Sequence, residues 1–215
     1  MKIKRFEFNM FPENCYVLWD DTQEAVIIDP GCFYEDEKQA LKGFLQGLEL
    51  NVRHLLCTHL HLDHIFGNPF LLRELGLKAE AHQADEFLLG EAAKQSRMFG
   101  FKTQEAPVPL GGYLNDGDLI TFGHTQLEAI HVPGHSPGSL VFYCAADGCM
   151  FSGDVLFQGS VGRADLFGGN FDTLIDGIRS RLFVLPPESV VYPGHGNPTT
   201  IGTEMAENPF FRHWQ

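Results

Sequence analysis

The stretch Thr58-His59-Leu60-His61-Leu62-Asp63-His64 places four potential metal ligands within six residues. It follows the apolar run 55–57, which is typical of a buried strand, and it precedes a Gly-Asn pair that indicates a turn into a helix. Alternate residues at a strand end lie on one side, so His59 and His61 can converge while the turn brings the last two donors around. The sequence therefore predicts a metal centre directly behind a strand.

Three further polar residues follow later strand-like runs. His135 lies in a loop rich in Gly and Pro, Asp154 follows Ser-Gly, and His195 follows Pro-Gly. Glycine lets the backbone approach a site closely. With the first four residues, these make seven donors, which is enough for two ions. The simplest division gives three donors to each ion and one bridge between them: His59, His61 and His135; Asp63, His64 and His195; and Asp154.

The chemistry of these donors favours zinc, with iron or manganese as alternatives, because imidazole nitrogen and carboxylate oxygen dominate over thiolate. Two divalent ions about 3.5–4 Å apart can share a hydroxide and stabilise a developing oxyanion. Asp29, which precedes Pro30 after a strand, either initiates a turn or accepts a hydrogen bond from a metal ligand. The remaining histidines lack comparable settings and are predicted to be structural or superficial: His54, His82, His124, His131 and His213.

Composition narrows the class of protein. A chain of 215 residues with 44% hydrophobic residues suits a single folded domain, 1–215, built from two similar halves. The formal charge of −13 disfavours nucleic-acid and anionic membrane partners. No signal-peptide pattern and no apolar run of roughly 18 residues is present, and the five cysteines are scattered, so we expect a soluble cytoplasmic protein.

Hydrophobic periodicity predicts two comparable sets of elements. Strands are expected at 3–8, 15–19, 25–28, 52–57, 79–82, 119–122, 126–132, 140–144, 149–151 and 190–192. Helices are expected at 36–48, 69–75, 84–98 and 171–185. The Pro- and Gly-rich segment 99–118 is either an ordinary surface loop or a connection that overhangs a cleft, with Met98, Phe99 and Phe101 as candidate wall residues.

Four motifs carry a resemblance to a known family: 58–64, Pro133-Gly134-His135-Ser136-Pro137-Gly138-Ser139, Ser152-Gly153-Asp154-Val155-Leu156-Phe157 and Pro193-Gly194-His195-Gly196. The chain resembles the metallo-β-lactamase superfamily, and within it the short bacterial glyoxalase II-like hydrolases related to hydroxyacylglutathione hydrolase. The segment Gly162-Arg163-Ala164-Asp165-Leu166 and the tail 198–210 match that subgroup as well. The resemblance implies an αββα sandwich of two mixed β-sheets flanked by helices, with the same seven ligands at one edge.

The expected activity is hydrolysis of S-lactoylglutathione or a related small acyl thioester by a metal-bridging hydroxide. Asp63 is expected to orient this hydroxide in addition to binding metal. A thiolate leaving group, with an ordinary thiol pKa of about 8.5, requires no dedicated general acid. Arg163 matches a basic residue that the family places near the substrate carboxylate, although a structural salt bridge is the alternative role.

Two departures from the pattern concern the substrate. Phe167 stands where many short relatives have proline. Full-length glyoxalase II enzymes hold glutathione with an additional C-terminal helical domain, and for a sequence that ends at Gln215 we expect no such contribution to glutathione recognition. The alternatives are a persulfide dioxygenase with mononuclear iron, a lactonase or β-lactamase, and a non-catalytic metal-binding scaffold. Retention of all seven donors favours a hydrolase. The oligomeric state is not predicted.

Overall fold

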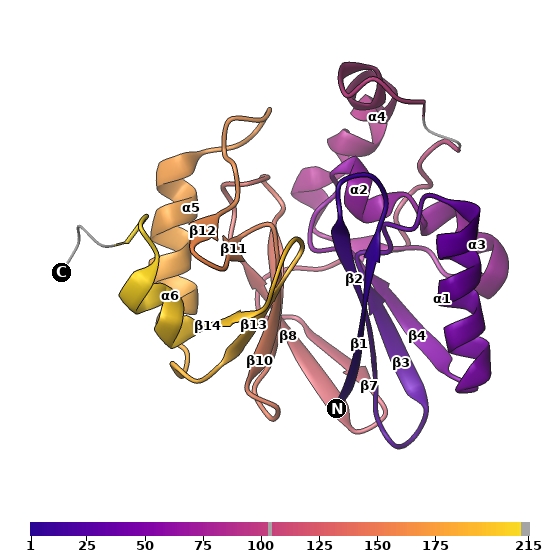
Figure 1. Ribbon diagram of the computed structural model, residues 1–215, viewed down its shortest axis with the longest axis horizontal. Helices are drawn as coiled ribbons and strands as arrows, with labels where there is room; N and C mark the ends of the chain where they lie inside the picture. Colours follow the sequence, from indigo (N-terminus) through magenta and orange to yellow (C-terminus); the bar gives the residue numbers. More distant parts are fainter. Residues whose placement is uncertain (103–104, 212–215) are drawn as a thin grey trace.

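The apolar runs of the sequence form two facing β-sheets with helices on both outer sides, as Figure 1 shows for the computed structural model. The structure describes residues 1–102 and 105–211. The first sheet has the order β1-β2-β3-β4-β5-β6 and the second the order β14-β13-β10-β9-β8-β7. The predicted αββα sandwich of two mixed β-sheets is therefore confirmed.

The first sheet begins with the antiparallel strands β1 (Lys2–Phe8), β2 (Glu13–Trp19) and β3 (Glu24–Ile28). Strands β4 (Asn51–Leu56), β5 (Glu80–Ala81) and β6 (Gly112–Tyr113) continue it in parallel. Side chains of β3 alternate between two cores: Ile27 packs beneath the helices and Ile28 packs between the sheets. Because both faces of this strand are buried, its residues 25–28 form a continuous apolar run in the sequence.

Figure 1 shows α1 (Glu35–Gly47) and α3 (Asn68–Leu75) beside the outer face of the first sheet, with α2 (Leu62–Ile65) and α4 (Phe87–Met98) at its upper end. The short 3₁₀ helix η1 (Gln83–Asp85) lies between β5 and α4 in the chain. At the start of α1 the Glu37 carboxylate accepts the backbone N–H groups of Phe33 at 2.7 Å and Tyr34 at 3.0 Å. At the end of α3, Gly76 adopts a φ of 71°, a left-handed conformation that favours glycine.

The second sheet consists of β7 (Leu119–Phe122), β8 (Thr125–His131), β9 (Leu140–Cys144), β10 (Cys149–Gly153), β13 (Val190–Pro193) and β14 (Thr199–Thr200). Only the pair β10 and β13 is parallel among these described strands. A separate hairpin joins β11 (Leu156–Phe157) to β12 (Ser160–Val161). The outer face carries α5 (Phe171–Gly177), its π-helical continuation η2 (Ile178–Leu182) and α6 (Ile201–Glu207).

A contact between the two halves positions one of the predicted ligands. The buried Asn14 of β2 donates its side-chain Nδ2 to the carbonyls of Pro193, at 3.0 Å, and Gly196, at 2.9 Å. The hydroxyl of Tyr16 donates to the same Pro193 carbonyl at 2.7 Å. The loop that carries His195 is therefore bound to the first sheet although it follows a strand of the second.

Element boundaries agree with the prediction to within a few residues, with identifiable exceptions. The helix predicted at 84–98 begins as η1, the helix at 171–185 ends in η2, and the segment 99–118 contains β6. Two-residue strands such as β11, β12 and β14 carry too little periodicity to be predicted. His213 and residues 103–104 of the predicted connection lie outside the described residues. Within the described part, no helix is both long and apolar enough to cross a membrane.

Candidate metal centre

The fold brings the seven predicted ligands together where the two sheets end side by side. Four of them, at 59–64, occupy the loop after β4 and the first turn of α2. His135 lies on the loop between β8 and β9, Asp154 directly follows β10, and His195 follows β13. The donors thus come from both halves of the chain and from four separate connections.

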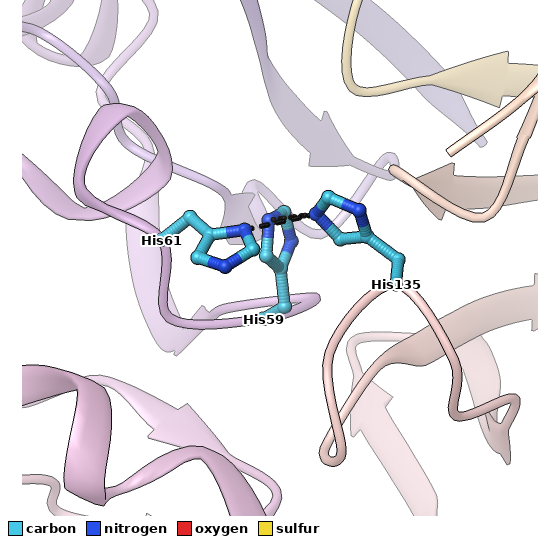
Figure 2. Close-up of side chains that lie close together, drawn as sticks. All are labelled: His59, His61 and His135. Atoms are coloured by element: carbon cyan, nitrogen blue, oxygen red, sulfur yellow. Dashed lines mark hydrogen bonds between the residues drawn. The ribbon is translucent and has the colours of Figure 1, made fainter. Parts of the chain in front are cut away.

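His59, His61 and His135 form the first donor group. Figure 2 shows their imidazole rings facing one another, two from the 59–61 loop and one from the opposite loop. His135 Nε2 lies 2.9 Å from His61 Nδ1 and 3.2 Å from His59 Nε2. One nitrogen from each ring lies within 4.8 Å of the other two. This is the arrangement expected of three nitrogen ligands that share one ion.

Asp63, His64 and His195 form the second group, again with ligand atoms within 4.8 Å of one another. The Asp63 carboxylate lies 3.2 Å from His195 Nε2 and 3.7 Å from His64 Nε2. Asp154 lies between the groups: its oxygens are 3.4 Å from His64 Nε2, 3.6 Å from His195 Nε2 and 3.7 Å from His135 Nε2. Its position suits a ligand that bridges two ions.

Hydrogen bonds on the far side of the rings fix which nitrogen faces the centre. His135 Nδ1 donates to the Arg163 carbonyl at 2.7 Å, and His195 Nδ1 donates to the Pro12 carbonyl at 3.1 Å. A carbonyl oxygen only accepts, so Nδ1 carries the proton and the lone pair of Nε2 points into the centre. Both rings are thereby prepared to bind a cation.

Asp29 fixes the orientation of two further rings. One of its oxygens accepts the Nδ1 proton of His64 at 3.0 Å and the hydroxyl of Thr58 at 2.6 Å, and the other accepts the Thr58 N–H at 2.7 Å. Since the Thr58 hydroxyl donates to Asp29, it accepts from His59 Nδ1 at 3.1 Å. Of the two roles predicted for Asp29, the hydrogen bonds support that of an acceptor behind the ligands.

Electrostatics differ between the two groups. Burial, with the neighbouring His135, lowers the pKa of His61 to about 3, and burial also holds the pKa of His59 well below its usual value. Burial alone would raise the pKa of Asp154, but His64 and His195 hold it well below the usual range. Burial would lower the pKa of His64, yet Asp63 and Asp154 raise it. His59 and His61 are therefore neutral, whereas the second group and Asp154 provide ionised carboxylates that attract a cation.

These residues fit a pair of divalent cations. Among the described residues, the buried atoms without a hydrogen-bond partner include His64 Nε2 and Asp154 Oδ1, and both belong to the centre. Buried polar atoms are normally satisfied, so a metal ion is the expected partner. The donor set of nitrogen and carboxylate oxygen suits zinc, iron or manganese.

Asp85 is a residue of the centre that the sequence did not reveal. It is fully buried, and one of its oxygens accepts the Ser136 hydroxyl at 2.7 Å and the Leu60 N–H at 3.2 Å. The other oxygen accepts the Gly138 N–H at 2.6 Å. Asp85 therefore binds the 59–61 loop to the loop of His135. A single Asp at the start of a helix has no sequence signal that would identify such distant partners.

A cavity of about 660 Å³ opens onto the centre. Its base includes five of the predicted ligands: His61, Asp63, His135, Asp154 and His195. Its walls come from Phe11, from α4 and its C-terminal end, and from the 163–167 loop. Met98 and Phe99 line the cavity as expected, but Phe101 does not. Phe101 instead packs against Phe11, Phe33 and Phe66 at centroid distances of 5.6–6.1 Å.

Arg163 lies on the cavity wall, and its guanidinium binds the Asp165 carboxylate with two contacts of 2.8 and 2.9 Å. Both roles considered for Arg163, wall residue and salt-bridge partner, are thus compatible with its position. The other described histidines lie outside the centre: His54 binds Glu80 at 2.8 Å, His82 stacks on His131 at 4.1 Å, and His124 is exposed.

Comparison with known proteins agrees with this geometry. The family model of the metallo-beta-lactamase superfamily matches residues 9–195. The Haemophilus influenzae protein hydroxyacylglutathione hydrolase GloC is 36% identical over 211 residues, which cover 98% of each chain. The crystal structure of the BLEG-1 B3 metallo-beta-lactamase has a TM-score of 0.88 at 35% identity and covers 98% of this chain and 100% of that one.

A second solved structure, TTHA1623 in a di-iron-bound form, has a TM-score of 0.85 at 37% identity, over 96% of this chain and 99% of that one. These similarities extend over nearly the full length of each protein, and they include the segments that carry the donors. The chain belongs to the metallo-β-lactamase superfamily.

Proposed function

We propose that this protein is a thioester hydrolase of glyoxalase II type that uses two divalent metal ions, with zinc as the first candidate and iron or manganese as alternatives. The observation that carries the proposal is the pair of three-donor groups, joined by Asp154, at the base of a large cavity. The name of the H. influenzae relative supports a hydroxyacyl thioester as substrate. The di-iron form of TTHA1623 supports iron as the alternative metal.

When bound, the two ions supply an acidified water molecule and Lewis-acid stabilisation of the carbonyl oxygen. His59, His61 and His135 would hold one ion, Asp63, His64 and His195 the other, and Asp154 would bridge them.

Asp63 has a second role in this proposal. Burial would raise its pKa, but His64 and His195 lower it, so the carboxylate is ionised at neutral pH. It also lines the cavity, where it can accept a hydrogen bond from the attacking water and orient it. The leaving group is a thiolate whose conjugate thiol has an ordinary pKa of about 8.5, so no residue has to protonate it.

The test combines elemental analysis of protein purified without added metal with an assay of S-lactoylglutathione hydrolysis. We expect about two ions per chain, by the argument from donor number, together with turnover. The variants His59→Ala and Asp63→Ala should lower kcat/KM by about a thousandfold or more, because each removes a metal ligand. His124→Ala, which changes an exposed histidine outside the centre, is the matched control.

Other outcomes would replace the proposal. A single iron per chain, without thioester turnover but with oxygen consumption on a persulfide, would indicate the dioxygenase. Unchanged hydrolysis in the His59 and Asp63 variants would exclude the centre as the catalytic site. Metal binding without turnover of any substrate would support the alternative of a non-catalytic metal-binding scaffold.

β-Lactam hydrolysis is a second candidate because the BLEG-1 B3 metallo-beta-lactamase is similar over the whole chain. A chromogenic cephalosporin assayed with the same metal-loaded protein distinguishes the two activities. The thioesterase proposal expects kcat/KM for S-lactoylglutathione to exceed that for the β-lactam.

A further inference from the structure

Two aromatic rings meet across the cavity above the metal centre. Phe87 belongs to α4, and Phe167 belongs to the loop between β12 and α5; their ring centroids are 5.5 Å apart at an interplanar angle of 71°. Both side chains line the cavity. Phe167 is nevertheless 82% exposed, so most of its ring is available for contact with another molecule. Large apolar side chains that are exposed together beside a candidate active site are typical of a binding surface.

The backbone behind Phe167 is closely packed. Gly168 has a φ of +87°, and a Cβ atom there would lie 2.8 Å from Pro137 Cγ and 3.7 Å from the Phe87 ring. Glycine permits both the left-handed conformation and this close approach. Since Pro137 lies two residues after His135, the position of the Phe167 ring is linked to a loop of the metal centre.

The apolar surface continues from this pair along the cavity. Met98 and Phe99, at the end of α4, line it and are 67% and 47% exposed. Phe11, from the turn between β1 and β2, contacts Phe99 with a centroid distance of 5.5 Å. The wall is therefore built of large apolar side chains from three separate segments.

The lysine and arginine side chains of this cavity are already paired. Lys94 binds Glu91 at 2.9 Å, and Arg163 binds Asp165 at 2.8 Å. In each pair the carboxylate offsets the charge of the cation and competes with a substrate carboxylate for it. A thiol portion rich in carboxylates, such as glutathione, gains little binding free energy from contact with these walls. An apolar group gains binding free energy because it buries apolar surface against them.

We propose that the cavity selects thioesters with a bulky apolar acyl group, and that Phe87 and Phe167 are the residues that determine this preference. The inference rests on the proposed thioesterase function and specifies the substrate class within it. The acyl group lies against the two rings while the carbonyl reaches the metal centre at the base of the cavity.

The test compares S-mandeloylglutathione with S-lactoylglutathione, which differ only by a phenyl in place of a methyl group. We expect kcat/KM of the wild-type protein to be at least about tenfold higher for the mandeloyl thioester, by analogy with the selectivity of apolar pockets for added carbon atoms. Phe167→Ala should reduce this ratio by about fivefold or more, mainly through KM, and Phe167→Leu should restore part of it. Phe210→Ala, which changes a partly exposed phenylalanine that does not line the cavity, should keep the wild-type ratio.

A binding measurement makes the inference independent of turnover. Isothermal titration calorimetry of the metal-loaded protein should show S-benzylglutathione binding more tightly than S-methylglutathione, and Phe167→Ala should abolish the difference. Equal binding of the two thioethers, or a wild-type preference for the lactoyl ester, would overturn the inference and leave the thioesterase function intact. Absence of turnover with both thioesters would overturn the proposed function, and the calorimetric comparison would then decide the preference of the cavity alone.

Discussion

Asp85 binds both loops that carry the first donor group of the candidate metal centre. Its three hydrogen bonds join the backbone beside His59 and His61 to the loop of His135. We expect Asp85→Ala to weaken metal affinity and lower kcat/KM by about 10–100-fold, the usual effect of removing a partner behind the ligands. Ser136→Ala removes one of these bonds and should have a smaller effect.

The measurement for Asp85 is competition with a chromophoric chelator, performed together with thermal unfolding. A variant that unfolds at a lower temperature but retains the wild-type metal affinity would show that Asp85 serves the fold alone. Reduced affinity with an intact fold would establish it as a positioning residue.

Between elements, the attachment of β5 to β4 depends on few backbone contacts because β5 has only two residues. The side chains add a hydrogen bond of 2.8 Å between His54 Nδ1 and Glu80. This bond is the main cause of the raised pKa of His54. Because the folded state favours the protonated form, the pair stabilises the fold fully below the unfolded pKa of about 6.5, and this contribution is lost as pH rises through the higher folded pKa.

The variant Glu80→Gln should therefore reduce the free energy of unfolding by a few tenths to about 1 kcal/mol near pH 5.5, the range for partly exposed ion pairs. The difference from the wild type should disappear at alkaline pH. Urea unfolding at several pH values measures it. A difference that is constant with pH would show that the pair acts by packing and not by charge.

At the scale of the whole molecule, the metal centre joins the two sheets. Four donors follow β4 of the first sheet, and three lie on loops of the second. Each ion bound here should stabilise the native state by about 4 kcal/mol when present at a thousandfold excess over its dissociation constant. Chelation of even one ion should then lower the melting temperature by roughly 10 °C in a chain of this size.

Differential scanning calorimetry with and without chelator measures this shift, and added zinc should reverse it. His195→Ala, which removes one ligand from the second half, should show a smaller shift. An unchanged melting temperature after complete metal removal would contradict the role of the ions as a link between the sheets.

The sequence predicted those features that depend on local pattern. The individual strands and helices followed from hydrophobic periodicity, whereas the double-sheet architecture was expected from the resemblance carried by the four motifs. The donors that the structure gathers were recognisable because short motifs hold them at strand ends. Features that depend on distant partners were missed. Asp85 acts on residues 25 to 53 positions away, and Phe101 turned inward to an aromatic cluster that only the folded chain assembles. A residue's environment across the fold cannot be read from its neighbours in sequence.

The attachment of the His195 loop to Asn14 and Tyr16 also has a consequence for biosynthesis. The two side chains are synthesised before the carbonyls that they bind, which lie 177 to 182 positions later in the chain. The nascent chain can present the cluster at 59–64 long before its counterparts at 154 and 195 exist. If the protein binds two ions as proposed, the full set of ligands exists only after residue 195 has been synthesised, and a ribosome that stalls before it leaves a chain with an incomplete set of ligands.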